Sequence, residues 1–152
     1  MEEITPRSEY YLLESHISAQ NAQILRAIHE VTAVTFTEQI RRAAALYDLA
    51  IDIFNQGGNI HSASEEGAEM IPLFNQPSDE DCDESRVFLR VNINTETANL
   101  FKKLGVNSND NETFVLDNVI HHYQLVTNKY LAGHKIIAES PEGLKREIEL
   151  LI

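Results

Sequence analysis

Residues 86–94, with the sequence RVFLRVNIN, alternate between two sets of side chains. One set is apolar and the other is mainly polar: Val87, Leu89, Val91 and Ile93 against Arg86, Phe88, Arg90, Asn92 and Asn94. A period of two residues is typical of a strand with one covered and one exposed face. We therefore predict a strand at 86–94 whose apolar set faces a core.

The period changes to that of a helix after this strand. Asn94 or Thr95 is suited to cap a short helix that runs to Leu104. A longer helix is predicted over 112–131, because apolar residues recur there at helical spacing: Leu116, Val119, Ile120, Tyr123 and Val126. Gly133 follows at a position where glycine commonly ends a helix.

The same order of patterns occurs earlier, from Tyr11 to Gly57. Its second helix opens with Thr35 and Glu38 at capping-box spacing. The predicted apolar stripe of that helix consists of Ile40, Ala43, Ala44, Tyr47, Ile51 and Phe54. Tyr47 and its counterpart Tyr123 are interpreted as core residues.

Each long helix is followed by a predicted hairpin, at 57–74 and at 133–150. Both begin with glycine and break at Ser-x-Glu-Gly, and residues 140–143, SPEG, suit a type I turn. We expect the hairpins to lengthen the core, to cover the helix ends or to pair with each other as a second small sheet. The apolar final residues, 148–152, predict an end that is tucked in or buried against another molecule, and further self-association is one such arrangement.

A shift of 76 positions aligns residues 10–76 (the first copy) with residues 86–152 (the second copy) without a gap. The identical pairs are Leu13/Leu89, Ile17/Ile93, Ala22/Ala98, Thr37/Thr113, Tyr47/Tyr123, Leu49/Leu125, Gly57/Gly133, Ile60/Ile136, Ser64/Ser140, Glu66/Glu142 and Gly67/Gly143. Most apolar positions also correspond. One exception is Leu46 against His122, which we place on a helix flank.

The net charge of -12 lies in the first half of the chain and in the segment between the copies. That segment, 77–85, reads PSDEDCDES; it contains five acidic residues and is interpreted as an extended linker. Cys82, the only cysteine, is expected to be an inert exposed thiol, which excludes disulfides and cysteine-based zinc sites. Without a signal-peptide pattern or an apolar run of bilayer length, we expect a cytoplasmic protein that does not enter membranes.

A strand and two helices of this size cannot cover their own apolar face, so each copy must pair with another. The order resembles the ribbon-helix-helix family of Arc/MetJ-like DNA-binding proteins, in which two units exchange strands to form an antiparallel ribbon. The resemblance is carried by residues 90–133, RVNINTETANLFKKLGVNSNDNETFVLDNVIHHYQLVTNKYLAG, and more weakly by 14–58, ESHISAQNAQILRAIHEVTAVTFTEQIRRAAALYDLAIDIFNQGG.

The resemblance implies an α+β, mostly helical fold in which two ribbon-helix-helix repeats, each with a C-terminal β-hairpin, form an intramolecular pseudo-dimer. The repeats are 10–76 and 86–152, joined by the linker 77–85 into one cooperative unit. A tether of this kind raises the effective concentration of the second repeat into roughly the millimolar range.

By the same resemblance, the outward ribbon side chains would enter the major groove of double-stranded DNA. Those residues are Arg90, Asn92 and Phe88 in the second copy and Glu14, His16 and Leu12 in the first. Arg90 suits guanine and Asn92 suits adenine, whereas Glu14 departs from the pattern because a carboxylate is repelled by phosphates. The expected phosphate-binding positions, at the start of each second helix, include Thr35, Thr37, Asn111 and Thr113.

Two functions remain open. The first is a DNA-binding transcriptional regulator or antitoxin-like protein that recognises a site without palindromic symmetry. The second is a degenerate, acidic ribbon-helix-helix module that binds a basic protein partner and not DNA. DNA affinity comes largely from neutralised phosphates, so a chain with a net charge of -12 offers little unless its few cations lie on one face. Arg41, Arg42, Lys102 and Lys103 are candidate phosphate contacts, but they are more simply solvated helix faces.

Enzyme chemistry has little support in the sequence. His121 follows Asp117 by one helical turn, which offers a metal or proton-transfer pair, but a surface hydrogen bond explains this spacing more simply. The glycines at 57 and 58 follow a helix, not a strand, and are explained as a helix stop. We therefore predict no enzymatic activity and no cofactor or metal.

Overall fold

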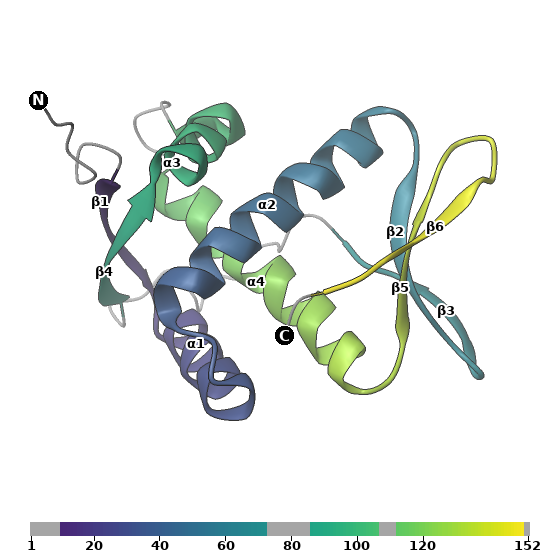
Figure 1. Ribbon diagram of the computed structural model, residues 1–152, viewed down its shortest axis with the longest axis horizontal. Helices are drawn as coiled ribbons and strands as arrows, with labels where there is room; N and C mark the ends of the chain where they lie inside the picture. The colour runs from purple at the N-terminus through teal and green to yellow at the C-terminus, as the bar shows by residue number, and fades with distance from the viewer. Residues whose placement is uncertain (1–9, 73–85, 107–111, 151–152) are drawn as a thin grey trace, which may run out of the picture.

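The computed structural model describes residues 10–72, 86–106 and 112–150. This part of the chain has an α+β fold in which about half of the residues are helical and two small antiparallel sheets are present. The sheets lie at opposite ends of the molecule, with a layer of helices between them (Figure 1).

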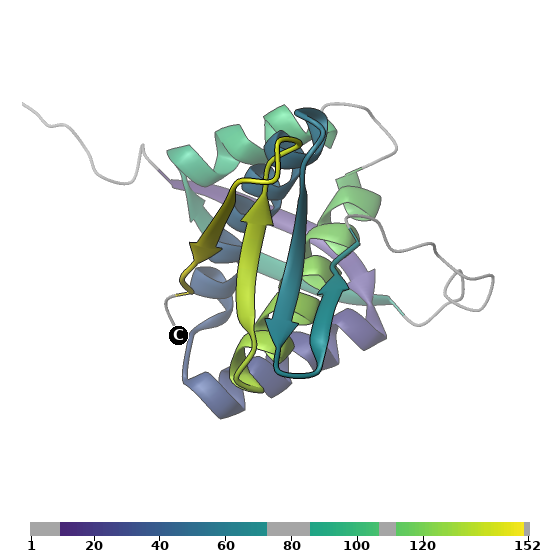
Figure 2. The ribbon, with the colours of Figure 1, turned by 90° about the vertical axis from the view of Figure 1, so that its right-hand side faces the viewer.

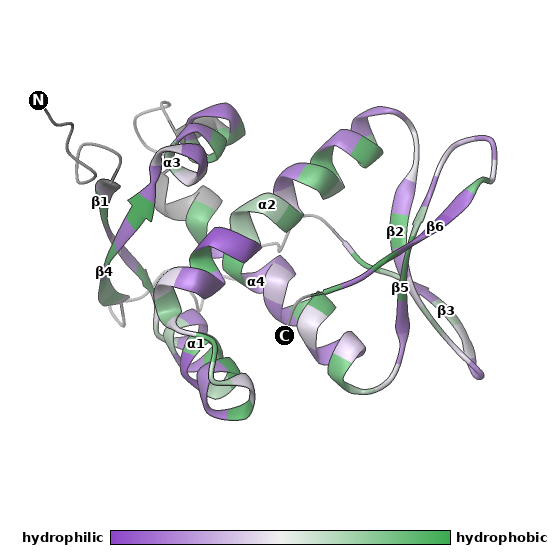
Figure 3. Ribbon diagram, in the orientation of Figure 1, coloured by the Kyte–Doolittle hydropathy of each residue, from purple (hydrophilic) through white to green (hydrophobic). Residues whose placement is uncertain are grey.

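The first sheet is a ribbon of two strands, β1 (Tyr10–Ser18) and β4 (Arg86–Asn94). They pair antiparallel over their full length, with Tyr10 opposite Asn94 and Ser18 opposite Arg86. The predicted strand at 86–94 is confirmed with its predicted bounds. Hydrophobic and hydrophilic residues alternate along this ribbon, so one face can cover a core while the other remains open (Figure 3).

Each ribbon strand leads into helices. They are α1 (Ala19–Thr32), α2 (Phe36–Asn55), α3 (Thr95–Phe101), the π-helix η3 (Lys102–Val106) and α4 (Glu112–Leu131). The side chain of Ser18 caps α1 by accepting from the amide of Asn21, and Asn94 caps α3 by accepting from the amide of Thr97. The predicted long helix at 112–131 is confirmed, whereas the short helix expected to reach Leu104 becomes π-helical after Phe101.

The second sheet is built from both predicted hairpins. It comprises β2 (Asn59–Ser64), β3 (Gly67–Met70), β5 (Lys135–Glu139) and β6 (Lys145–Ile148), in the order β3-β2-β5-β6. Figure 2 shows this sheet in front of the helices. The hairpins therefore do pair with each other, through β2 and β5. The turn at 140–143 closes with the amide of Gly143 donating to the carbonyl of Ser140, and Gly143 has a φ of 90°.

Residues 76 positions apart meet at the centre of both junctions between the copies. In the ribbon, Glu14 lies opposite Arg90; in the second sheet, His61 lies opposite Ile137. An antiparallel pair of equivalent strands has this register when a two-fold axis relates the strands. Both registers are those expected if an approximate two-fold axis relates the equivalent strands.

The core lies between the long helices and both sheets. Corresponding residues of α2 and α4 are buried together: Ile40 and Leu116, Ala43 and Val119, Ala44 and Ile120, Tyr47 and Tyr123, and Ala50 and Val126. Full burial of a large apolar side chain contributes roughly 1.5–3 kcal/mol. Burial raises the pKa of Tyr47 to about 12, as expected for a core tyrosine that stays protonated.

Two expectations about side-chain position are wrong. Phe54 was assigned to the apolar stripe of α2 but is 56% exposed, because it lies in the last turn of that helix, beyond most of the packing against α4. His122 was placed on a helix flank but is only 1% exposed. It occupies the position that corresponds to buried Leu46, and it packs edge-on against the ring of Tyr47, with 5.3 Å between ring centroids.

Candidate nucleic-acid interface

The outer face of the β1–β4 ribbon carries all six residues predicted to enter the major groove. They form three cross-strand pairs: Leu12 with Asn92, Glu14 with Arg90, and His16 with Phe88. All six are exposed, because the alternate residues of both strands, including Leu13, Ile17 and Val91, turn inward to the core. The strand pattern therefore placed these side chains together on one face.

An ion pair occupies the centre of this face. The Arg90 Nε and the Glu14 Oε2 are 3.4 Å apart, and both side chains are substantially exposed. The formal charges of Glu14 and Arg90 cancel, so with neutral His16 the six residues have no net charge. The departure noted for Glu14 is thus matched by Arg90, the one arginine or lysine among these six residues. The pairing of Glu14 with Arg90 was not predicted, although the repeat offset of 76 relates the two positions.

The remainder of the face is partly apolar and aromatic. The rings of His16 and Phe88 contact each other across the ribbon, with a centroid distance of 5.1 Å. Leu12 and Phe88 are 48% and 52% exposed. An open face with aromatic and aliphatic side chains and one arginine has the composition of a recognition surface.

Side chains of the first turns of α2, together with its cap Thr35, hydrogen-bond to one another at the start of that helix. Thr35 caps the helix by accepting from the amide of Glu38, as the capping-box spacing predicted. The carboxylate of Glu38 accepts hydrogen bonds from Arg41 and, at 2.8 Å, from Arg42. The hydrogen bond from Arg41 is the main reason that the pKa of Glu38 is lowered to about 2. One carboxylate therefore binds two candidate phosphate contacts, Arg41 and Arg42, and offsets one of their two positive charges.

The other predicted clamp positions are less informative. Thr37 is exposed in the first turn of α2. Asn111 lies outside the described residues, and Thr113 belongs to α4 but its side chain is not among those described. Lys103 of η3 is 2.9 Å from Asp48 of α2, so another candidate phosphate contact is paired with an acid.

Asp117 has a structural role. Its Oδ1 accepts from the amide of Ser18 at 3.2 Å and from the side-chain amide of Asn21 at 2.8 Å, which ties α4 to the start of α1. These bonds are to α1 and not to His121, so they do not test the interpretation of the Asp117/His121 spacing. Among the residues that the structure describes, no three histidine, cysteine, aspartate or glutamate side chains gather to hold a metal ion.

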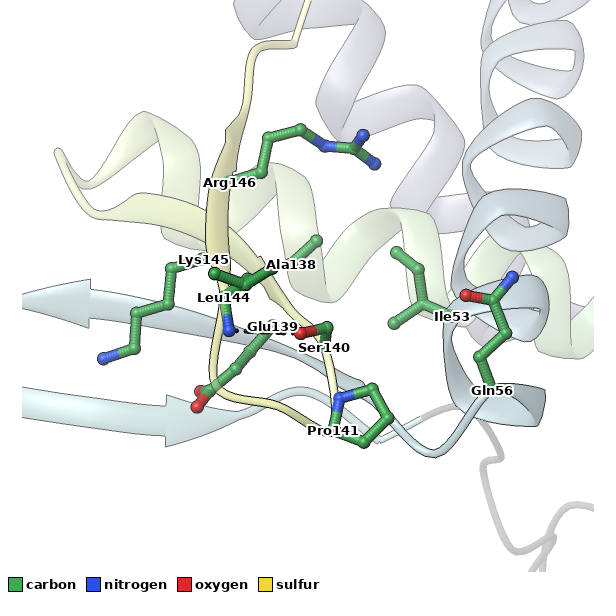
Figure 4. Close-up of a pocket in the computed structure, with 9 residues that line it drawn as sticks. All are labelled: Ile53, Gln56, Ala138, Glu139, Ser140, Pro141, Leu144, Lys145 and Arg146. Atoms are coloured by element: carbon green, nitrogen blue, oxygen red, sulfur yellow. Dashed lines mark hydrogen bonds between the residues drawn. The ribbon is translucent and has the colours of Figure 1, made fainter.

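A pocket of about 330 Å³ lies where the end of α2 meets the β5–β6 turn, with Ile53, Pro141 and Arg146 in its lining (Figure 4). One of its polar groups is used locally: the Ser140 hydroxyl accepts from the amide of Leu144 at 3.1 Å. The pocket has no arrangement of residues that indicates catalysis.

Comparison with known proteins supplies no assignment: no protein-family model, curated protein or solved structure matches this chain significantly. Over residues 10–72, 86–106 and 112–150, no helix is both long enough and apolar enough to cross a bilayer. The ribbon face is therefore the feature of the described residues that bears most on function.

Proposed function

We propose that the chain is a DNA-binding protein of ribbon-helix-helix type, a pseudo-dimer within one polypeptide, that places the outer face of β1 and β4 in the major groove. The observation that carries this proposal is the exposed two-stranded ribbon, in which Arg90 and Asn92 are presented on the side away from the core. A two-stranded ribbon fits the width of the major groove. The resemblance of 90–133 to the family supports the same assignment.

Recognition in this proposal requires the central ion pair to open. Arg90 would leave Glu14 and donate two hydrogen bonds to guanine, while Asn92 would bind adenine through its carboxamide. Because the Glu14–Arg90 pair is exposed, it contributes little in water, on the order of 0–1 kcal/mol, so its opening is compatible with binding. The remaining Glu14 carboxylate suits the amino group of cytosine.

A titration with a pool of random duplexes at low salt, followed by selection of the bound sequences, tests this function. We expect Arg90→Gln to weaken binding of the selected sequence roughly tenfold, since one bidentate contact is lost. We expect Glu14→Gln to strengthen binding to random duplex, because it removes a negative charge facing phosphates. Lys145→Gln, on β6 at the opposite end of the molecule, is the control with the same loss of charge as Arg90→Gln (Figure 1).

A second function is favoured by a specific observation: several of the candidate cations already contact acidic side chains, whereas among the described residues Arg26 and Lys102 have no such contact. Arg90 is paired with Glu14, Arg41 and Arg42 with Glu38, and Lys103 with Asp48, while the whole chain has a net charge of -12. A protein with excess negative charge attracts a basic protein partner. In this alternative the module binds that partner and does not bind DNA.

The two functions give opposite results in one experiment. Duplex DNA and a lysine-rich peptide are titrated separately at low and at moderate salt. Duplex binding that weakens steeply with salt, and that Arg90→Gln reduces, supports the DNA function. Salt-sensitive binding of the peptide with no binding of duplex supports the protein partner and contradicts the DNA function.

A further inference from the structure

A hollow of about 290 Å³ lies beside the ribbon, between β4, α1 and the start of α2. Strand β4 contributes five consecutive residues, 87–91, to its lining. Successive residues of a strand point to opposite faces, so a hollow that touches all five lies along the edge of the strand. Because the other edge of β4 pairs with β1, this is its free edge. We call this hollow, lined by 87–91, Arg26 and Phe36 among others, the edge notch.

The floor of the edge notch is apolar, whereas its rim carries positive charge. The floor is formed by core residues such as Leu25, which is 3% exposed. The exposed residues of the lining are Arg26, Phe36, Phe88 and Arg90. Two of these four are arginines, and none of the described residues that line the notch is acidic. The notch therefore suits a ligand that is anionic on one side and apolar on the other.

Arg26 differs from the other arginines of the first copy. Arg41 and Arg42 both bind Glu38, whereas Arg26 forms no ion pair with an acidic side chain of the described residues. Glu30 follows Arg26 by four residues on α1, a spacing at which helical ion pairs form, yet these two are not paired. The guanidinium of Arg26 thus keeps its N–H donors for a group outside the chain.

The place of the edge notch beside the ribbon face indicates which anion it fits. Phe88 and Arg90 belong both to the outer face of the ribbon and to the rim of the notch. When a two-stranded ribbon lies in the major groove, its outer side chains reach the bases, and the sugar–phosphate backbones pass along the free edges of the strands. Each backbone alternates a charged phosphate with a largely apolar deoxyribose. This alternation matches the charged rim and the apolar floor.

We propose that the edge notch holds the backbone of one DNA strand, with Arg26 donating hydrogen bonds to a phosphate and the apolar floor against the adjoining deoxyribose. This inference rests on the function proposed for the ribbon, to which it adds a residue that binds the backbone. A guanidinium can bind a phosphate through two parallel hydrogen bonds. A contact of this kind fixes the position of the ribbon on the duplex and carries no sequence information.

The second copy has a cation at the equivalent position. Lys102, 76 residues after Arg26, is exposed at the end of α3, and it also forms no ion pair with an acidic side chain of the described residues. The approximate two-fold relation of the ribbon strands places Lys102 on the side of β1, as Arg26 is on the side of β4. Lys102 would then face the backbone of the opposite DNA strand. A lysine makes no bidentate contact, so its share of the affinity is the smaller one.

The salt dependence of duplex binding tests the role of Arg26. The full chain is titrated with the sequence selected from random duplexes and with an unrelated duplex of the same length. Arg26→Gln should weaken both by the same factor, roughly fivefold, and should reduce the slope of log Kd against log salt by about one. Arg90→Gln should weaken chiefly the selected sequence. Arg146→Gln, the same change at an exposed position of β6 at the other end of the molecule, is the control and should alter neither (Figure 1).

Duplexes that carry a single neutral methylphosphonate identify the contact directly. At the phosphate that Arg26 binds, this replacement should weaken binding of the unchanged chain by roughly fivefold. It should not weaken Arg26→Gln further, because that interaction is already lost. Thermal unfolding of Arg26→Gln checks that the variant is folded, and we expect its Tm to be unchanged because Arg26 is exposed and has no ion pair.

The results separate failure of this inference from failure of the ribbon function. Duplex binding by the unchanged chain that Arg26→Gln leaves unaltered in affinity and in salt slope would overturn the inference alone. Loss of the selected sequence only, or losses that add at every methylphosphonate position, would also overturn it. Absence of duplex binding by the unchanged chain would overturn both the inference and the ribbon function.

Discussion

The two copies share one plan of strands and helices, but they differ where they meet. At the ribbon centre the first copy has Glu14 and the second has Arg90, and these two residues face each other. A ribbon formed by two first copies would instead place glutamate opposite glutamate. A ribbon formed by two second copies would place arginine opposite arginine. Like charges directly opposite each other are destabilising. The difference therefore favours pairing between the copies over pairing of either copy with itself.

A similar divergence occurs at the long helices. Asp117 of α4 ties that helix to the start of α1, whereas the corresponding residue of α2, Arg41, binds Glu38 within its own helix. Leu46 and His122 differ in the same way, one completing the core and one adding an unpartnered polar group. The shared backbone keeps both halves complementary in shape, while individual side chains have become specialised.

The largest expected effect comes from separating the copies. Residues 10–76 or 86–152 alone should be unfolded or self-associated, since each would lose its ribbon partner and its neighbour in the second sheet. Amide resonance dispersion and molecular mass check this prediction. A monomeric half with sharp, dispersed resonances would show that the copies do not depend on each other.

The next effect concerns acid stability and distinguishes His122 from Leu46. The pKa of His122 is about 4 in the folded chain, compared with about 6.5 for an ordinary histidine, so between these values the unfolded state binds more protons. The contribution of neutral His122 to the free energy of unfolding is therefore complete above pH 6.5. It is lost as the pH falls toward 4, by about 3 kcal/mol in total. Urea unfolding from pH 7 to pH 4 should show this decline.

His122→Leu is the matched variant for that series. It should be at least as stable as the unchanged chain at pH 7, because two buried polar atoms are removed, and it should lose much of the decline in acid. His121, whose pKa burial also lowers, contributes a residual slope of the same sign. An unaltered pH profile in the variant would contradict the assignment to His122.

A smaller effect compares Gly58 with His134, its equivalent in the second copy. A Cβ at Gly58 would lie 2.2 Å from the carbonyl oxygen of Glu139, so Gly58→Ala must displace backbone where the end of α2 meets β5. We expect a loss of about 2 kcal/mol in the free energy of unfolding. His134→Ala should cost about 0.5 kcal/mol or less, because that site already accommodates a side chain. Similar losses for both would show that Gly58 is not sterically restricted.

The smallest effect is the charge swap at the ribbon centre. Glu14→Arg should destabilise by about 0.5 kcal/mol through repulsion of Arg90, and less at high salt, because both positions are exposed. Adding Arg90→Glu should restore the stability lost in Glu14→Arg. A double variant no more stable than the single one would show that the two charges do not interact.

Strong periodicity made much of the fold predictable. The strand at 86–94 and the helix at 112–131 were located within their observed bounds, because apolar residues recur there with one clear period. The exposure of Arg90 and Asn92 followed from strand alternation. The ribbon register was also available in principle, since equivalent strands related by a two-fold axis pair at their central residues, which are Glu14 and Arg90.

Other features could not be predicted from the local sequence pattern. Histidine occurs both on surfaces and in cores, so the burial of His122 was missed although its equivalent, Leu46, is apolar. The π-helical turn at 102–106 departs from an otherwise regular helical pattern. The pairing of Arg41 and Arg42 with Glu38 depends on side-chain rotamers, and it decides how much positive charge is free near the ribbon.

The second sheet has a kinetic consequence. Because β2 pairs with β5 as β1 pairs with β4, strand pairing joins the two copies at both ends of the helical layer. If the strands of one sheet separate, the other sheet still holds the two copies together. The separated strands can then pair again before the copies come apart. The central amides of both sheets should accordingly exchange with solvent only when the whole molecule opens.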